Sequence, residues 1–92
     1  MSTTHAVVTE LGGDHSGIVA SIAQALADND ANIDDMRQNV VKGIFSMTML
    51  VSFDEQTVPF DEVQEALERA GRDVGVQVRL QREDVFKFMY NV

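Results

Sequence analysis

Hydrophobic residues follow two different periods along the N-terminal half of the chain. The apolar centre of residues 4–11 predicts a short strand, and residues 31–41 predict a second strand. Between them, residues 18–28 repeat a large apolar side chain at every fourth position, which is the spacing of an amphipathic helix. Those side chains are Ile18, Ile22 and Leu26. We expect Asp14 to cap this helix through its carboxylate, with Ser16 as the second choice.

Residues 44–53 carry the clearest strand pattern. Every second residue is large and apolar, which places one face of this strand in a core. That face consists of Phe45, Met47, Met49, Val51 and Phe53. Lys42 and Gly43 precede the strand, and they predict a tight hairpin because glycine readily adopts the positive φ that such turns need.

A helix, a strand and an apolar extension are predicted for the C-terminal half. After Pro59, an apolar stripe at helical spacing predicts a second helix, and Gly71 is a natural position for its end. The stripe consists of Phe60, Val63, Leu67 and Ala70. The alternation from Val74 to Leu80 predicts a fourth strand with one wet face. Residues 82–92 are too apolar for a free tail and predict a short terminal helix or hook.

This order of elements, βαββαβ, is typical of the ferredoxin-like α+β fold. Right-handed crossovers then place both helices on one face of a four-stranded antiparallel sheet, with residues 31–41 as an edge strand. A chain of 92 residues is short for more than one domain, so we expect residues 1–92 to form a single domain in which 82–92 are a C-terminal helical extension.

The composition excludes several functions. Lysine and arginine number 7 against 15 aspartates and glutamates, and the formal net charge is −8. Nonspecific binding to nucleic acid or to an anionic membrane needs basic clusters, so neither partner is expected. The chain has no cysteine, which removes disulfides, thiol catalysis and cysteine-held metals. No apolar run reaches the roughly 20 residues that span a bilayer, and no secretory signal pattern is present. We expect a cytoplasmic protein without a cofactor.

The connector between the first strand and the first helix is the most informative segment. It reads Gly12-Gly13-Asp14-His15-Ser16-Gly17-Ile18. Glycines allow the backbone to approach a ligand, and the free amides of a helix start bind a carboxylate or a phosphate. The alternative is that the glycines only make the turn. If a ligand binds, we expect Gly17 to matter because it lacks a Cβ, so that valine there would block the ligand and leave the fold largely intact. The competing interpretation is that Gly17 needs a positive φ, so that valine there would unfold the protein.

Enzyme-like interpretations of this segment are weak. Asp14, His15 and Ser16 are the residue types of a catalytic triad, but neighbours in sequence cannot adopt its geometry. A metal site at His15 lacks partners, since the chain has only one other histidine. Asp34 and Asp35 should point to opposite faces of a strand, which makes a shared metal ion awkward. We therefore expect no catalytic residues and no metal site.

Two motifs together resemble a known family. Residues 13–20 read Gly-Asp-His-Ser-Gly-Ile-Val-Ala, and they are followed after the helix by Asn32-Ile33-Asp34-Asp35 and then by Phe45-Ser46-Met47. In this combination, and in the order βαββαβ, nearly the whole chain resembles the ACT domain. More narrowly, it is similar to small stand-alone ACT proteins, an uncharacterised family related to regulators of the glycine cleavage system.

The resemblance implies a regulatory domain, usually a homodimer, that binds an amino acid or another small metabolite and signals through a protein partner. In the family, the loop after the first strand of one subunit faces the first helix and second strand of another. The positions that match these motifs are Gly13, Asp14, Gly17, Ile18, Asn32 and Ile33, and the candidate site also includes Gly12, His15 and Ser16. Ser16 departs from the proline of many ACT loops. The alternative function is a structural or protein-interaction module without a ligand.

Overall fold

The computed structural model describes residues 3–14 and 16–90. Within these residues the chain forms four strands and three helices in the order βαββαβα. Their bounds are β1 (Thr3–Gly13), α1 (Ile18–Asp28), β2 (Asn32–Val41), β3 (Ile44–Asp54), α2 (Phe60–Asp73), β4 (Val76–Arg82) and α3 (Glu83–Tyr90).

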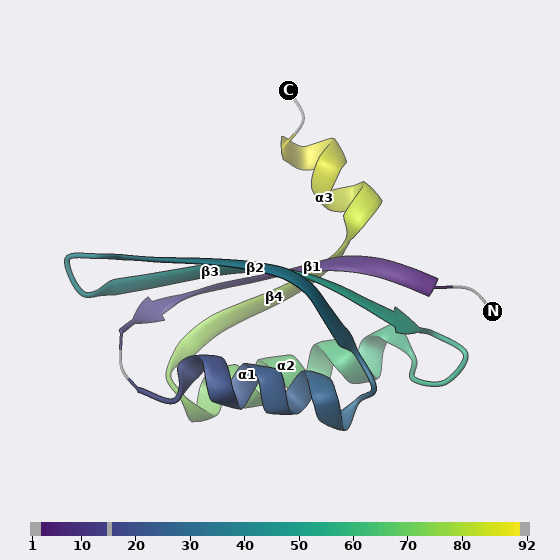
Figure 1. Ribbon diagram of the computed structural model, residues 1–92, viewed down its shortest axis with the longest axis horizontal. Coiled ribbons are helices and arrows are strands. Elements are labelled where there is room, and N and C mark those ends of the chain that lie inside the picture. Colours follow the sequence, from purple (N-terminus) through teal and green to yellow (C-terminus); the bar gives the residue numbers. More distant parts are fainter. Residues whose placement is uncertain (1–2, 15, 91–92) are drawn as a thin grey trace.

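The four strands make one sheet in the order β2-β3-β1-β4, and each neighbouring pair is antiparallel. Figure 1 shows α1 and α2 side by side along one face of this sheet, while α3 leaves from the opposite face. The predicted ferredoxin-like arrangement with two helices on one face is therefore confirmed. The second strand lies at an edge of the sheet, also as predicted.

The hydrophobic core fills the space between the sheet and the two helices. All five alternating residues of β3 are buried there, together with the apolar stripes of α1 and α2. The core consists of Ala6, Val8, Ile18, Ile22, Leu26, Phe45, Met47, Met49, Val51, Phe53, Val63, Leu67, Val76 and Leu80. Because these side chains face inward at the periods expected for strand and helix, the sequence pattern is enough to define the two layers.

The hairpin between β2 and β3 turns at Lys42 and Gly43, which both have positive φ (51° and 78°). This geometry confirms the predicted tight turn, because primed hairpin turns require positive φ at both central residues. The Asp14 N–H donates to the Gly43 carbonyl at 2.9 Å. The turn is thereby tied to the loop that follows β1, which fixes one side of the site described below.

The predicted cap of α1 is wrong. The residue that precedes the helix is Gly17 in the left-handed conformation (φ 92°), and glycine has no side chain with which to cap the first turn. The backbone of Asp14 instead stays with the hairpin through its bond to Gly43. The strand also lasts longer than predicted, since Gly12 and Gly13 still pair with β3.

The predicted end of α2 at Gly71 is also wrong, because the helix continues to Asp73 and the left-handed residue after it is Gly75 (φ 73°). Gly71 serves the packing of α2 against β4. A Cβ at this position would lie 2.5 Å from Val78 Cγ2 and 2.9 Å from the Val76 carbonyl oxygen. A close approach inside a helix and a helix stop are both reasons for glycine, and the sequence does not distinguish them.

A polar cluster lies at the end of the sheet opposite the hairpin of Lys42 and Gly43. Arg82 makes two hydrogen bonds to the Glu55 carboxylate, at 2.7 and 2.8 Å, and Thr4 donates a third. The Arg82 guanidinium also lies over the Phe60 ring, 4.5 Å from its centroid. The hydrogen bonds from Arg82 and Thr4 hold the pKa of Glu55 at about 2. The cluster joins β1, the loop before α2 and the end of β4.

The predicted C-terminal helix is present as α3, and residues 91–92 lie outside the described residues. It runs close to β1 and β4 on the sheet face away from α1 and α2 (Figure 1). Val7 points to this face and is buried, whereas Val85 of α3 is about half exposed.

Candidate functional site

A recess of about 420 Å³ lies between the start of α1 and the C-terminal end of β2. The loop after β1 forms one wall, and β2 forms the other. The residues that line it are Asp14, Gly17, Ile18, Val19, Ala20, Gln38, Asn39, Val40 and Phe45. The recess therefore joins the glycine-rich connector to an edge strand.

The start of α1 gives this recess the chemistry of an anion site. The first amides of a helix have no partner inside the helix. In α1 the capping position is Gly17, which has no side chain to bond them, and the first turn contains no acidic residue. The helix dipole adds partial positive charge at the same place. A carboxylate is therefore well matched to the amides near Val19 and Ala20.

The conformation of Gly17 favours the second of the two interpretations given for it. A Cβ at this position would meet no atom within 4 Å, so space for a ligand does not by itself require glycine. The backbone conformation does, because φ is 92° and side chains with a Cβ rarely adopt it. Valine at position 17 would strain the turn, and the expectation that it leaves the fold intact is wrong.

The predicted loop residues divide between the recess and its surroundings. Asp14, Gly17 and Ile18 line the recess. Gly12 belongs to β1 and packs against β4, since a Cβ there would lie 2.6 Å from Val76 Cγ1. Gly13 ends β1, Ser16 is exposed in the turn, and His15 lies outside the described residues.

Asn32 and Ile33 lie at the opposite end of the sheet from the loop within one chain. Asn32 pairs with Ser52, which in turn pairs with His5, whereas Gly13 pairs with Ile44 at the hairpin end. The structure therefore does not bring the two predicted motifs together in a single subunit. The placement remains compatible with a site shared between two subunits, which is the arrangement that the family resemblance implies.

The Asn32 side chain already has a partner in its own strand. Its amide donates to Asp34 Oδ1 at 2.7 Å, and the Ser52 hydroxyl donates to the same oxygen at 3.1 Å. A β-bulge between Ile33 and Asp35 shifts the register beside this group. The Asp35 carboxylate accepts from the Met36 N–H at 2.8 Å. These bonds give both aspartates structural roles.

Every residue of β2 is exposed. Four of them are large and apolar. Three of these four have register partners on β3 that point into the core, so they face the same side as α1. These are Ile33 (36% exposed), Met36 (42%) and Val40 (50%). An unpaired edge with an apolar stripe beside it is typical of a surface that pairs with another chain.

Gln38, Asn39 and Val40 were missed by the sequence analysis, although they form the second wall of the recess. The topology of the predicted fold could have identified these three residues. In a βαβ unit with parallel β1 and β2, the residue positions that end β2 lie at the same edge of the sheet as the loop after β1. Applying that rule to the predicted strand 31–41 would have selected its last residues instead of its first.

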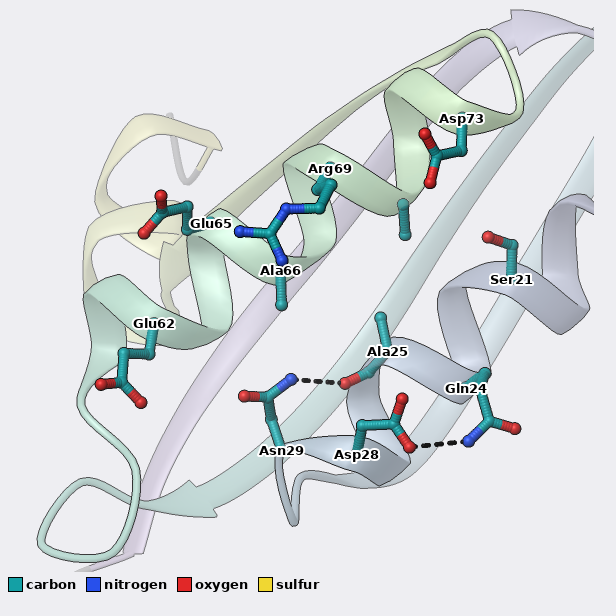
Figure 2. A pocket seen from close by; sticks show the side chains of 11 residues that line it. Ser21, Gln24, Ala25, Asp28, Asn29, Glu62, Glu65, Ala66, Arg69 and Asp73 are labelled. Atoms are coloured by element: carbon teal, nitrogen blue, oxygen red, sulfur yellow. Dashed lines mark hydrogen bonds between the residues drawn. The ribbon is translucent and has the colours of Figure 1, made fainter.

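A groove of about 620 Å³ runs between α1 and α2 on their outer surface. Figure 2 shows small residues along it, including Ala25 and Ala66, and acidic side chains from both helices around them. Two hydrogen bonds at the end of α1 occupy part of its polar surface: Gln24 donates to Asp28, and Asn29 donates to the Ala25 carbonyl, each at 2.8 Å. None of the predicted site residues lines this groove.

The described part of the chain contains neither a candidate metal cluster nor a membrane-spanning helix. No group of three or more histidine, aspartate or glutamate side chains in residues 3–14 and 16–90 is arranged to hold a metal ion. None of the described helices is long and apolar enough to cross a membrane.

Comparison with known proteins gives the class first. The family model of the ACT domain matches residues 4–81. An ACT domain protein from Streptococcus pneumoniae superimposes with a TM-score of 0.80 at 34% identity, covering 97% of this chain and all of that one. The chain therefore belongs to the ACT domain family, whose members are regulatory domains that bind small molecules.

Within that family, the chain is similar to a named but uncharacterised group. The UPF0237 protein MK1213 of Methanopyrus kandleri is 45% identical over 89 residues, which is 97% of this chain and 99% of that protein. A putative glycine cleavage system transcriptional repressor shares the fold, with a TM-score of 0.79 at 24% identity over 89% of this chain and 47% of that one. Both the family and the narrower resemblance seen in the sequence are confirmed.

Proposed function

We propose that this chain is a metabolite-sensing ACT domain that acts as a homodimer, with an amino acid as the first candidate ligand. The observation that carries the proposal is the recess at the start of α1, where Gly17 occupies the capping position, directly beside the edge strand β2. In this proposal the domain is a cytoplasmic sensor and not an enzyme, and residues 82–92 extend a single ACT unit.

A two-fold axis explains why two distant motifs belong to one site. If β2 pairs antiparallel with β2 of a second copy, the start of one strand lies beside the end of the other. Asn32 of the partner subunit then approaches the recess formed by Gln38, Asn39 and Val40. The same pairing covers the apolar stripe of β2 and satisfies its free edge.

The ligand's two charged groups match different parts of the recess. Its carboxylate would accept hydrogen bonds from the first amides of α1. Its ammonium would donate to the Asp14 carboxylate, which is exposed and not used as a helix cap. Asn39 supplies an amide that both donates and accepts.

Ala20 offers a direct test of the carboxylate position, because it lines the recess in the first turn of α1 and is exposed. A glutamate at a helix start favours the helix, so Ala20→Glu should fold normally while its own carboxylate competes with the ligand. Ala20→Gln has the same size without the charge. In a thermal-shift screen of the twenty amino acids, we expect a hit that stabilises wild type, stabilises Ala20→Gln less and leaves Ala20→Glu unchanged.

Dimerisation is tested separately by sedimentation equilibrium. Wild type should have twice the chain mass of 10.2 kDa. Met36→Glu, in the apolar stripe, should be monomeric, whereas Leu50→Glu, an equally exposed position on the other sheet face, should remain dimeric. A wild-type monomer at every concentration would remove the shared site. A dimer that responds to no amino acid would favour the structural module instead.

A further inference from the structure

Two arginines lie in one row of side chains on the sheet face away from α1 and α2. In the register, Arg37 of β2 pairs with Thr48 of β3, and Arg79 of β4 pairs with Thr9 of β1. The two threonines pair with each other in the middle of the sheet. Because the residues on either side of Thr48 point into the core, all four side chains of the row face away from the helices. The row therefore crosses all four strands, with a guanidinium at each end and two hydroxyls between them.

The side chains of this row have no hydrogen-bond or ion-pair partner within residues 3–14 and 16–90. Both arginines and Thr48 are exposed, and Thr9 is half-buried. The ion pairs seen in the described residues use Arg82 and Lys87 instead. The chain has 15 acidic residues against 7 lysines and arginines, yet these two arginines keep all their donors available for a ligand.

The charges around the row favour an anion. In the two adjacent rows of this face, which the structure describes in full, Asp35 is the one acidic residue, and its carboxylate accepts from the next backbone N–H. On α3, which leaves the same face, Glu83 pairs with Lys87 and Asp84 accepts from the next backbone N–H. The acids of α1 and α2 lie on the other side of the sheet (Figure 1). Salt largely screens charges more than about 8 Å away, so the two guanidiniums dominate at the row itself.

The length of the row favours a ligand with several anionic groups. Three strand spacings of about 4.8 Å separate Arg37 from Arg79, so their backbones lie about 14 Å apart. A hollow of about 310 Å³ borders the row at Arg37 and Thr48, and Arg79 and Thr9 line a cavity at the β4 edge. A phosphate group offers three strong acceptor oxygens, which suit the planar fork of arginine and a hydroxyl together.

We propose that this row binds an oligophosphate, whose terminal phosphates accept from Arg37 and Arg79 and whose middle accepts from the two threonine hydroxyls. The aromatic side chains of the described strands, Phe45 and Phe53, are in the core, so the row offers no ring to a nucleobase. The phosphate chain is therefore the group that is recognised. None of the row lines the recess at the start of α1, so this site is independent of the amino-acid site proposed above.

The proposal is tested with sodium tripolyphosphate as the probe, by an NMR titration of the intact protein at pH 7. We expect saturable shifts of the Thr9 and Thr48 backbone amides and of the Nε–H signals of Arg37 and Arg79. Inorganic phosphate should bind at least tenfold more weakly, because it reaches only one end of the row. Magnesium-free ATP should bind with a Kd similar to that of tripolyphosphate. Binding of ATP more than tenfold tighter would show that the nucleoside is recognised and would overturn the proposal.

Variants with matched charge changes decide which residues are responsible. Arg37→Gln and Arg79→Gln should each raise the Kd for tripolyphosphate about tenfold, since each removes a charge-assisted contact. Arg72→Gln removes the same charge from an exposed position of α2, on the other side of the sheet, and should leave the Kd unchanged. Thr48→Val keeps the shape of the side chain without its hydroxyl and should raise the Kd several-fold.

Two results would overturn the proposal. Equal losses in Arg72→Gln and Arg37→Gln would show nonspecific attraction to any arginine. Shifts confined to residues 17–20 would place the anion at the start of α1 and not at the row. The amino-acid screen depends on other residues, so the failure of either proposal leaves the other one standing.

Discussion

Replacing Glu10 by glutamine should change how the stability of this domain depends on pH. The substitution keeps the size and shape of the side chain and removes its ability to ionise. In wild type the carboxyl is buried without a partner among the described residues, and burial raises its pKa from 4.5 to about 8. The folded protein therefore holds a proton that the unfolded chain releases at lower pH.

The sign and size of the effect follow from linkage. Between pH 4.5 and pH 8 the folded state binds more protons at Glu10 than the unfolded state, so the free energy of unfolding falls as pH rises. The slope is about 1.4 kcal/mol per pH unit, which gives a loss of about 3 kcal/mol between pH 4.5 and pH 7. The stabilising contribution is fully present below pH 4.5 and is lost by about pH 8.

Urea unfolding of wild type and Glu10→Gln at a series of pH values isolates this contribution. Other carboxylates titrate in both proteins, so they cancel in the difference between the two unfolding free energies. We expect the variant to gain stability relative to wild type as pH rises from 4.5 to 8, and Glu65→Gln, at an exposed position of α2, to show no such trend. A difference that is independent of pH would show that Glu10 is ionised and solvated in the folded state, and would refute the reasoning.

Two further predictions concern packing and the polar cluster. Gly71→Ala should destabilise the fold by about 1–3 kcal/mol in urea unfolding, the usual cost of overpacking, because its Cβ would meet β4. Gly13→Ala, where a Cβ meets nothing within 4 Å, is the matched control, and equal losses at both positions would contradict the packing argument. Arg82→Gln should raise the pKa of Glu55 from about 2 toward 4.5, because its largest stabilising hydrogen bond is lost. A carboxyl NMR titration measures this directly, and an unchanged value would show that Arg82 does not hold Glu55 in solution.

The layers of the fold were predictable because burial here follows simple periods. The alternation through β3 and the four-residue repeat in α1 both point into one core, and the turn at Lys42 and Gly43 is set by backbone sterics alone. Two of the errors came from glycines. Gly17 and Gly71 were each assigned one of several roles that glycine performs, and only the three-dimensional neighbours and the value of φ decide among them.

Only one wall of the candidate site could be predicted from the sequence. The loop motif identified Asp14, Gly17 and Ile18, which do line the recess. The opposite wall, at the end of β2, depends on which strand ends share an edge of the sheet, and no local pattern encodes that. The burial of Glu10 was not predicted, because a glutamate after the apolar centre of a strand usually marks the boundary of the core. The residues that lie near it include Gln64 and Glu68 of α2, which are far along the chain.

The exposure of β2 links the folding of this domain to its proposed function. A long edge strand is a liability in water, since its free N–H and C=O groups can pair with any other strand. In β2 the charged residues Asp34, Asp35 and Arg37 oppose nonspecific pairing, while Ile33, Met36 and Val40 keep an apolar stripe beside α1. Such a strand suits one specific partner, and a second copy meets that need by symmetry.

The recess opens at this same edge, so a ligand bound there would touch both subunits and stabilise the dimer through its own binding free energy. Sensing and assembly would then be a single equilibrium, which gives this domain a way to report the concentration of a metabolite.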